Sequence, residues 1–349
     1  MTKLEKGSLF DHIHSYLKIY LPKQRKVSQN TVRSYREALE LLVDFIKDKN
    51  RIPLADVTLE MLDADTLVDY LDFLENERGC AVATRNTRLA AVRAFYKYVA
   101  DKDVSAVASF AKVKKIPVKN PDTVQAVKYM SEEAVAAVIT QPNADTQKGL
   151  RDRFFMMLLY DTGARVQELI DVKLCDFRFG KTPTVTLCGK PNKKLRTVPL
   201  MEKTVAHLRQ YMEVFHPKAS NSDAPLFYTI AHGKVNPMSD DCVRKFLKRY
   251  GTLAQKICIA VPDNVHPHLF RHSRAMHLYQ RGMDLTLVSQ WLGHANLSTT
   301  LVYAHADTEH KRRAIETATS NGTATPINIS PKRFTVTDEM ELKRLSGLI

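Results

Sequence analysis

The chain has 349 residues, of which 44% are hydrophobic, and it carries a net charge of +14 at neutral pH. This length is comfortable for two domains, and the apolar content is that of a globular protein, which excludes broad disorder. The excess of positive charge favours a polyanionic partner, usually nucleic acid, although a solvated cationic surface explains the charge alone about equally well.

The cysteines, the hydropathy and the N-terminus indicate the compartment. The five cysteines are dispersed without a C-x-x-C pair, which predicts reduced thiols rather than a disulfide framework. No apolar run approaches the roughly 18 residues needed to cross a bilayer. The N-terminal segment lacks the apolar core of a signal peptide. We therefore predict a cytoplasmic protein without a membrane partner.

The first part of the chain, residues 1–111, is predicted to be a helical domain. In the stretch SQNTVRSYREALELLVDFIKD, apolar residues recur every three or four positions, and Ser28 precedes them as a helix N-cap. The stretch 82–100 shows the same period and places Arg85 and Arg88 away from its apolar face. The pattern indicates a compact all-helical unit with several basic residues outside its core.

Residues 112–128 are predicted to be a basic linker between two domains. The segment KVKKIPVKNPDTVQAVK combines two prolines with many charges and shows no apolar periodicity. Such a linker either lies along a phosphate backbone or is a solubilised connector, and composition favours neither. Its candidate DNA-binding residues are Lys112, Lys114, Lys115 and Lys119.

Residues 129–318 are predicted to form a second, mainly helical domain with a small antiparallel sheet. Ser131 is the expected N-cap of its first helix, and a strongly apolar later helix is expected to end at Gly163. The segments TVTLC and RTVPL are predicted to pair as a hairpin whose turn is rich in lysine. Residues 319–349 follow as a tail, with a polar loop and the short amphipathic helix TDEMELKRLSGL.

Two arginines in this second domain have neighbours at helical spacing. Glu168 lies three residues after Arg165, on the same face of a predicted helix, and a carboxylate there can aim the guanidinium at a phosphate. His268 and Arg271 also share a helical face. Each of these residues alone is more often structural than functional.

A tyrosine follows these residues in the chain. Tyr303 lies nine positions after His294 in WLGHANLSTTLVYAH. A lone tyrosine is usually part of a core or a surface, but two arginines, two histidines and a tyrosine in this order are suited to holding a phosphate and attacking it with a hydroxyl. The set therefore points to breaking and rejoining of DNA.

The histidines also allow a different interpretation, a zinc site. His268 and His272 are separated by four residues, which is a spacing of metal ligands on a helix. The region lacks a nearby acidic or cysteine ligand, and Arg271 would place a fixed cation beside the metal. We therefore predict that the chain binds no metal.

Four segments resemble, in order and spacing, the signature boxes of the tyrosine recombinase/integrase family. They are DTGARVQEL, GKPNKKLRTVPL, HPHLFRHSRAMHL and WLGHANLSTTLVYAH. The chain is most similar to Xer-like and phage- or transposon-type bacterial members, and the resemblance covers nearly all of it. It implies an N-terminal SAM-like helical core-binding domain and a C-terminal tyrosine recombinase catalytic domain, and no cofactor.

The resemblance also implies a role for each matching residue. Two arginines clamp the phosphate, an acid orients the first of them, a lysine protonates the leaving 5′ oxygen, two histidines complete the site, and a tyrosine is the nucleophile. In that order these are Arg165 and Arg271, Glu168, Lys190, His268 and His294, and Tyr303.

The sequence departs from the family pattern in the hairpin and in one helix. The hairpin is one residue longer than usual, so Lys193 and Lys194 stay alternatives to Lys190. An arginine stands at position 274, where the family usually has an apolar residue, and this predicts an exposed helix or a contact with DNA. The predicted DNA-binding residues outside the linker are thus Arg85, Arg88 and Arg274.

We predict a site-specific DNA recombinase of the integrase or transposase type. It would cleave and rejoin DNA through a 3′-phosphotyrosyl intermediate and a Holliday junction, without metal or ATP, because the phosphotyrosine bond keeps the energy of the phosphodiester. A type IB topoisomerase shares the chemistry but not the order of the boxes. The alternative from another class is a catalytically silent DNA-binding accessory or regulatory protein of the same fold.

The resemblance implies the partners as well. They are double-stranded DNA with inverted-repeat core sites and further copies of the chain, four on two DNA sites, with or without a partner recombinase. The tail, residues 319–349, is expected to contact a neighbouring protomer, and the alternative is that its helix folds back on its own domain.

Overall fold

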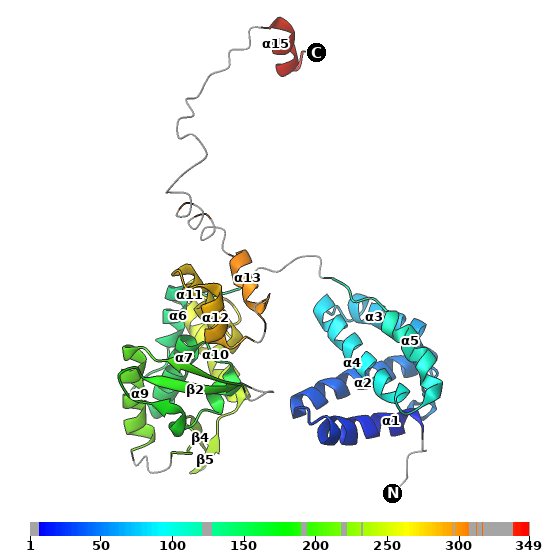
Figure 1. Cartoon of the computed structure of the whole chain (residues 1–349), viewed down its shortest axis with the longest axis horizontal. Helices are drawn as coiled ribbons and strands as arrows, with labels where there is room; N and C mark the ends of the chain where they lie inside the picture. The colour runs from blue at the N-terminus through cyan, green and yellow to red at the C-terminus, as the bar shows by residue number, and fades with distance from the viewer. Residues whose placement is uncertain are drawn as a thin grey trace. The chain divides into compact units, whose positions relative to one another are not determined.

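The chain folds into two compact units, residues 1–125 and 126–349. Each unit has its own hydrophobic core, and Figure 1 shows their elements. The computed structural model describes residues 7–120, 128–189, 194–217, 222–231, 233–294, 296, 298–306, 312, 316 and 338–348.

The first unit is helical, as the apolar periodicity predicts. Ser28 is the N-cap of its longest helix and accepts a hydrogen bond from the backbone N–H of Thr31. Tyr16, Phe95 and other apolar side chains from several helices fill the core. Its elements are α1 (Leu9–Ser15), a π-helix (Tyr16–Gln24), α2 (Gln29–Asn50), a 3₁₀ turn (Leu54–Asp56), α3 (Ala64–Asn76), α4 (Val82–Ala100), a 3₁₀ turn (Val104–Ala106) and α5 (Val107–Lys115).

The start of the predicted linker is in fact helical. Lys112, Lys114 and Lys115 belong to the last turn of α5, on its exposed side. The helix forms because the buried Val113 packs into the core of the first unit, together with Ile116 just beyond the helix. Two apolar residues, Val113 and Ile116, are too few to show a helical period among the surrounding prolines and charges, so the sequence does not predict this helical turn.

The chain beyond α5 is fixed to α4 by side-chain hydrogen bonds. Arg85 Nη1 donates to the carbonyl oxygen of Pro117 at 2.9 Å. Asn86 Nδ2 donates to the carbonyl oxygen of Lys119 at 2.7 Å, and its Oδ1 accepts from the Lys119 N–H. The Lys119 ammonium group also pairs with Glu75 of α3. This segment therefore belongs to the first unit up to residue 119.

The second unit contains the remaining described helices. Ser131 caps the first of them through the N–H of Ala134, as predicted. The apolar helix α7 is almost completely buried and ends at Gly163, again as predicted. The helices are α6 (Glu132–Ile139), α7 (Gln147–Thr162), α8 (Val166–Ile170), α9 (Glu202–Phe215), α10 (Asp240–Gln255), α11 (Pro267–Gln280), α12 (Leu285–Leu292), α13 (Ser298–Ala306) and α15 (Glu339–Leu345).

The second unit also contains two small antiparallel sheets. The predicted hairpin is present, and its register pairs Leu187 with Arg196. A two-residue strand extends it to a three-stranded sheet in the order β1-β2-β3, and a separate hairpin forms the second sheet. The strands are β1 (Phe177–Arg178), β2 (Thr184–Gly189), β3 (Lys194–Pro199), β4 (Tyr228–Ala231) and β5 (Lys234–Pro237). The prediction of a mainly helical fold with a small antiparallel sheet is confirmed.

The structure describes all five cysteines, and all five are free thiols. Among the described helices, none combines the length and the apolar character that a membrane span requires.

Candidate active site

The first predicted phosphate ligand, Arg165, lies between two helices. Gly163 ends α7 in the left-handed conformation, with φ of +59°, and Arg165 is then the N-cap of α8. Its Nη1 donates to Glu168 Oε1 at 2.8 Å, while 38% of its side chain is exposed. A carboxylate therefore orients this guanidinium group, and solvent still reaches it.

Glu168 is buried between two arginines. Its Oε2 accepts hydrogen bonds from the backbone N–H of Arg165 at 2.9 Å and from Arg196 Nη2 at 2.7 Å. Burial raises the pKa of Glu168, but the hydrogen bonds and charge of Arg196, with the hydrogen bonds from Arg165, outweigh it and bring the pKa to about 2. Glu168 is therefore ionised at neutral pH.

The second predicted phosphate ligand, Arg271, is buried on α11. Its Nη1 donates to the carbonyl oxygen of Gly163 and its Nη2 to that of Leu292, both at 2.7 Å. Burial and then the charges of Arg165 and Arg196 lower the pKa of Arg271 to about 9. The nearby Glu168 opposes this shift, and the side chain is still a cation at neutral pH.

His268 lies in the first turn of α11, where Pro267 occupies the first helical position. Its side chain is exposed. Partial burial of the ring and the charge of Arg271 lower the pKa of His268. The imidazole is therefore neutral at physiological pH and faces solvent beside the arginines.

The second predicted histidine, His294, follows the left-handed C-cap residue of α12, Gly293. Its Nδ1 lies 2.7 Å from the hydroxyl oxygen of the buried Thr300. Burial and then the charge of Arg271 lower the pKa of His294 to about 4. The hydrogen bond with Thr300 fixes the ring, so that the other ring nitrogen is left for a ligand.

The predicted nucleophile, Tyr303, is on α13 and is 1% exposed. Its ring packs in a small apolar cluster between α11 and α12 that includes Met276 and Leu292. Its hydroxyl oxygen lies 2.8 Å from Nδ1 of His272. Burial, followed by the charge of His268, lowers the pKa of His272 to about 4, so its ring is neutral and can accept the hydrogen bond of the tyrosine hydroxyl.

The structure thus brings together the predicted residues that it describes. The charges of Arg165 and Arg271 both act on His268 and on His294, and the charge of Arg271 acts on Tyr303. The six residues that share this environment are Arg165, Glu168, His268, Arg271, His294 and Tyr303.

Two members of the site were missed by sequence reasoning. His272 was weighed only as a metal ligand, whereas in the structure it contacts the Tyr303 hydroxyl. Arg196 was not considered at all, although it binds Glu168. The signal for Arg196 was available, because a charged residue at an inward position of a strand, two before the buried Val198, needs a partner.

The lysine of the hairpin cannot be placed. Lys190 and the alternative Lys193 lie outside the described residues. The backbone of Lys194 is described and pairs with Gly189 at the end of the hairpin. The role of Lys190 stays a prediction.

The remaining predicted DNA-binding residues differ in their environment. Arg85 is buried, and Arg274 donates to Asp161 Oδ1 at 3.0 Å with 15% of its side chain exposed. Arg88 Nη1 donates to Cys80 Sγ at 3.2 Å. All three guanidinium groups have partners inside the protein, and their contacts with DNA stay predictions.

The zinc interpretation finds no ligand set. Within the described ranges, no three His, Cys, Asp or Glu side chains come close enough together to hold a metal ion. Nδ1 of His272 is engaged by Tyr303 instead.

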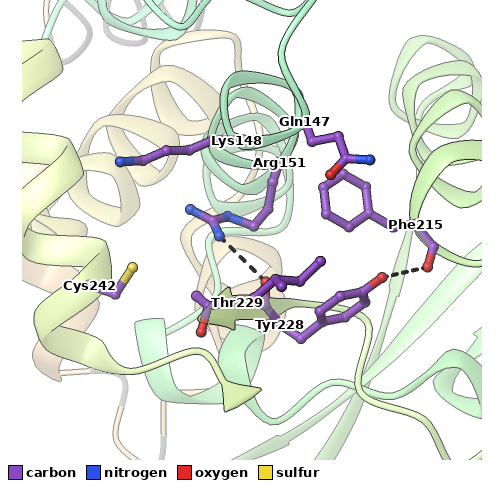
Figure 2. A pocket seen from close by; sticks show the side chains of 8 residues that line it. Gln147, Lys148, Arg151, Phe215, Tyr228, Thr229 and Cys242 are labelled. Carbon is purple, nitrogen blue, oxygen red and sulfur yellow. Dashed lines mark hydrogen bonds between the residues drawn. The ribbon is translucent and has the colours of Figure 1, made fainter. Parts of the chain in front are cut away.

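The cavities of the second unit separate into two regions. One cavity of about 340 Å³, between α7, α10 and β4, is drawn in Figure 2 and contains none of the predicted site residues. There Arg151 Nη1 donates to the carbonyl oxygen of Tyr228 at 3.5 Å. Another cavity, of about 430 Å³, is lined by His268 and by Arg244 and Lys248 of α10. Asp240 also lines this cavity and pairs with Arg244 at 2.6 Å, so the candidate site continues into a groove with walls of mixed charge.

Comparison with known proteins decides the family. The sequence profile of the phage integrase family matches residues 128–310, and that of the phage integrase N-terminal SAM-like domain matches residues 13–103. A putative integrase/recombinase, y4rC, of Sinorhizobium fredii is 30% identical, over 90% of this chain and 92% of its own. The tyrosine recombinase XerD of Haemophilus influenzae is 33% identical, over 84% of this chain and 93% of its own.

The chain belongs to the phage integrase family and is a tyrosine-type DNA recombinase. The predicted family and enzyme class are thereby confirmed. The fold of this recombinase is similar to that of the Tn1549 transposon integrase in complex with transposon right end DNA, with a TM-score of 0.66 and 16% identity, over 88% of this chain and 99% of the other.

Proposed function

We propose that this recombinase is site-specific and that Tyr303 is its nucleophile. The observation that carries the proposal is the charge of the site. The charges of Arg165 and Arg196 both act on Arg271, and the buried Glu168 is the carboxylate that pairs with Arg165 and Arg196. An excess of fixed positive charge around a tyrosine hydroxyl is the environment that a phosphodiester in transfer requires.

The cleavage step follows from these groups. The Tyr303 oxygen attacks the phosphorus, a bond to phosphorus forms, and the bond from phosphorus to the 5′ oxygen breaks. The hydroxyl proton leaves to a base, for which the neutral His272 is in hydrogen-bond contact. The product is a 3′-phosphotyrosyl link and a free 5′ hydroxyl, whose proton Lys190 supplies in this proposal. The reverse reaction with another 5′ hydroxyl rejoins the DNA, with neither ATP nor a metal ion.

The arginines and histidines stabilise the charge that develops on the non-bridging oxygens. The guanidinium group of Arg165 is reached by solvent and can contact the phosphate directly. Arg271 is buried and adds a second positive charge to the site. His268 and His294 are neutral in the free protein, and their ring N–H groups remain donors at neutral pH. Since Tyr303 is 1% exposed, binding of DNA has to uncover its hydroxyl.

The partner in this proposal is double-stranded DNA with inverted-repeat core sites. Arg244, which pairs with Asp240, and Lys248 line the groove that reaches His268, and Lys248 supplies a cation for the backbone of the duplex there. Four protomers on two sites exchange strands through a Holliday junction, with or without a partner recombinase. The similarity to integrases solved with DNA supports the duplex as ligand.

The tail supplies the contact between protomers in this proposal. Residues 338–348 include α15, and its apolar side chains are exposed, with Leu342 at 50% and Leu345 at 73%. A helix this short is not stable alone. We assign its apolar side to the catalytic domain of the adjacent protomer.

The test is a covalent complex on a nicked suicide substrate, detected as a protein–DNA adduct in a denaturing gel. The wild type is expected to form the adduct, and Tyr303→Phe is expected to form none while binding DNA with unchanged affinity, because binding rests on many phosphate contacts. Tyr228→Phe is the matched control, since Tyr228 lies away from the site and donates to Phe215. An adduct with Tyr303→Phe would reject this nucleophile, and DNA binding without any adduct in the wild type would favour the silent accessory protein.

A further inference from the structure

The inference concerns Arg196, to which the family resemblance gives no role. The strand β3 alternates, so that Val198 is buried and Leu195 is 65% exposed. Position 196 faces inward in this alternation and an apolar side chain is the expected occupant. Instead it holds an arginine whose side chain is 10% exposed. A guanidinium group this buried requires hydrogen-bond partners, and the partners of Arg196 indicate what the residue does.

The first partner is the carboxylate that orients Arg165. Arg196 Nη2 donates to Glu168 Oε2 at 2.7 Å, while Arg165 Nη1 occupies the other oxygen. Both oxygens of the carboxylate are thus engaged, and Oε2 also accepts from the backbone N–H of Arg165. Removal of Arg196 would leave Glu168 with contacts to Arg165 alone, so the position of the carboxylate and of the Arg165 guanidinium group would be less well defined.

The second partner is the backbone that leads to His294. Arg196 Nε donates to the carbonyl oxygen of Trp291 at 3.0 Å, at the C-terminal end of α12, where a cation is favourable. The arginine also lies against Gly293, where an added Cβ would meet its Cδ at 2.9 Å. The left-handed turn that presents His294 is therefore built against this one side chain.

The third connection of Arg196 is through its own backbone, which is part of strand β3. Arg196 belongs to the hairpin that carries Lys190, and it pairs with Leu187 of β2 in the register of the sheet. The same side chain consequently joins three parts of the site: the hairpin, the turn before α8 and the end of α12.

We propose that Arg196 is a positioning residue, which sets the arrangement of Arg165 and His294 without contacting the phosphate. The proposal rests on the function proposed above. Both Nη2 and Nε of Arg196 point to protein acceptors, so its effect on the reaction passes through Glu168 and the Trp291 carbonyl.

The experiment compares Arg196→Lys with Arg178→Lys in the full chain. Lysine keeps the positive charge and can donate to one of the two acceptors. It lacks the planar guanidinium group, which donates to Glu168 and to the Trp291 carbonyl oxygen at the same time. Arg178 is on the same sheet and exposed, so its replacement is the matched control. We expect Arg196→Lys to bind DNA within about twofold of wild type and to form the covalent adduct about 10- to 100-fold more slowly at saturating DNA. A normal rate, or a loss confined to affinity, would overturn the proposal.

The combination with Glu168→Gln separates positioning from a general loss of stability. If Arg196 acts through Glu168, the double variant is expected to cleave no more slowly than the slower single variant. If the rate loss of the double variant equals the product of the losses of the two single variants, the residues act independently and this coupling is contradicted. The comparison is made below the thermal transition of each variant, so that the folded fraction does not enter.

A readout without DNA distinguishes this proposal from the proposed function. The chain has a single tryptophan, so the indole N–H signal of Trp291 is unambiguous in an NMR spectrum. We expect this signal and the ring signals of His294 to shift in Arg196→Lys and to stay in place in Arg178→Lys. Unmoved signals would reject the positioning role even if Tyr303 is the nucleophile, and shifted signals would support it even if another residue is.

Discussion

At the scale of single residues, the site combines permanently charged arginines with histidines that are neutral. Burial keeps the rings of His272 and His294 uncharged, with pKa values of about 4. A neutral ring at position 272 can receive a proton from the tyrosine, and a neutral ring at position 294 adds no repulsion to the arginines. In the proposed reaction the arginines supply positive charge that binds the phosphate, and His272 supplies an uncharged nitrogen that accepts the tyrosine proton.

The same residues make stability depend on pH. In the unfolded chain a histidine has a pKa of about 6.5, so between pH 6.5 and 4 the unfolded state binds more protons than the folded state does. Stability is therefore expected to fall as the pH is lowered through this window, by at most about 1.4 kcal/mol per pH unit for each such histidine. The urea midpoint of unfolding, measured across the window, should decrease less steeply in His294→Gln than in wild type. Equal slopes would show that His294 does not titrate in this way.

At the scale of elements, what the sequence predicts well is local. The cap at Ser131, the end of α7 at Gly163 and the β2–β3 hairpin depend on neighbours within a few residues, and the structure has all three. The sequence predicts a linker from residue 112, whereas the last turn of α5 extends to Lys115, because Val113 is buried in a core formed by residues distant in the sequence.

The assembly of the site is not predicted by local sequence patterns, because it depends on contacts between segments that are distant in the sequence. Arg271 reaches the carbonyl oxygen of Gly163 across 108 positions, and Arg196 reaches Glu168 across 28. The family resemblance identifies the residues that match its boxes. The strand pattern indicates that Arg196 needs a partner, but that this partner is Glu168, and that His272 contacts Tyr303, follows only from the folded structure.

The turn after α7 provides a test of how tightly these elements fit. An alanine at position 163 would be strained at φ of +59°, and its Cβ would meet Leu292 Cδ2 at 2.8 Å. Gly233, at φ of +72° with no neighbour within 4 Å, is the matched control for the backbone strain alone. We expect Gly233→Ala to cost about 1 kcal/mol in the free energy of unfolding and Gly163→Ala about 1–3 kcal/mol more. Denaturant unfolding measures the free energy of unfolding of both variants. Equal losses would mean that the Leu292 side chain moves aside without a cost in free energy.

At the scale of the whole molecule, the units have separate cores, and the tail carries a short amphipathic helix whose apolar side chains belong to neither core. The tail matters for assembly if the proposed contact between protomers exists. We expect a chain truncated after Thr319 to bind a single DNA site normally but to lose the pairing of two sites, because the contact is made only between protomers. A mobility-shift assay with one-site and two-site DNA measures both properties.

Two point variants sharpen the truncation. Leu345→Asp places a charge on the apolar side of α15, whereas Lys343→Gln changes the same helix at a polar position. The proposed contact requires the first to reproduce the truncation and the second to behave as wild type. Normal pairing and recombination by Leu345→Asp and by the truncated chain would place the helix elsewhere.

The hydrogen bonds that hold residues 117–119 against α4 set the length of the tether between the units. Among the described residues that follow, Met130 is held in the second unit, where its backbone N–H donates to the buried Ser273 Oγ at 2.8 Å. Eleven Cα-to-Cα steps separate residues 119 and 130, and a fully extended chain of that length spans at most about 40 Å. Such a short tether confines the second unit to a local concentration on the order of millimolar. If both units contact DNA as the sequence predicts, engagement of the second unit is an intramolecular step once the first is bound, and a weak affinity of each unit is then enough for a long-lived complex.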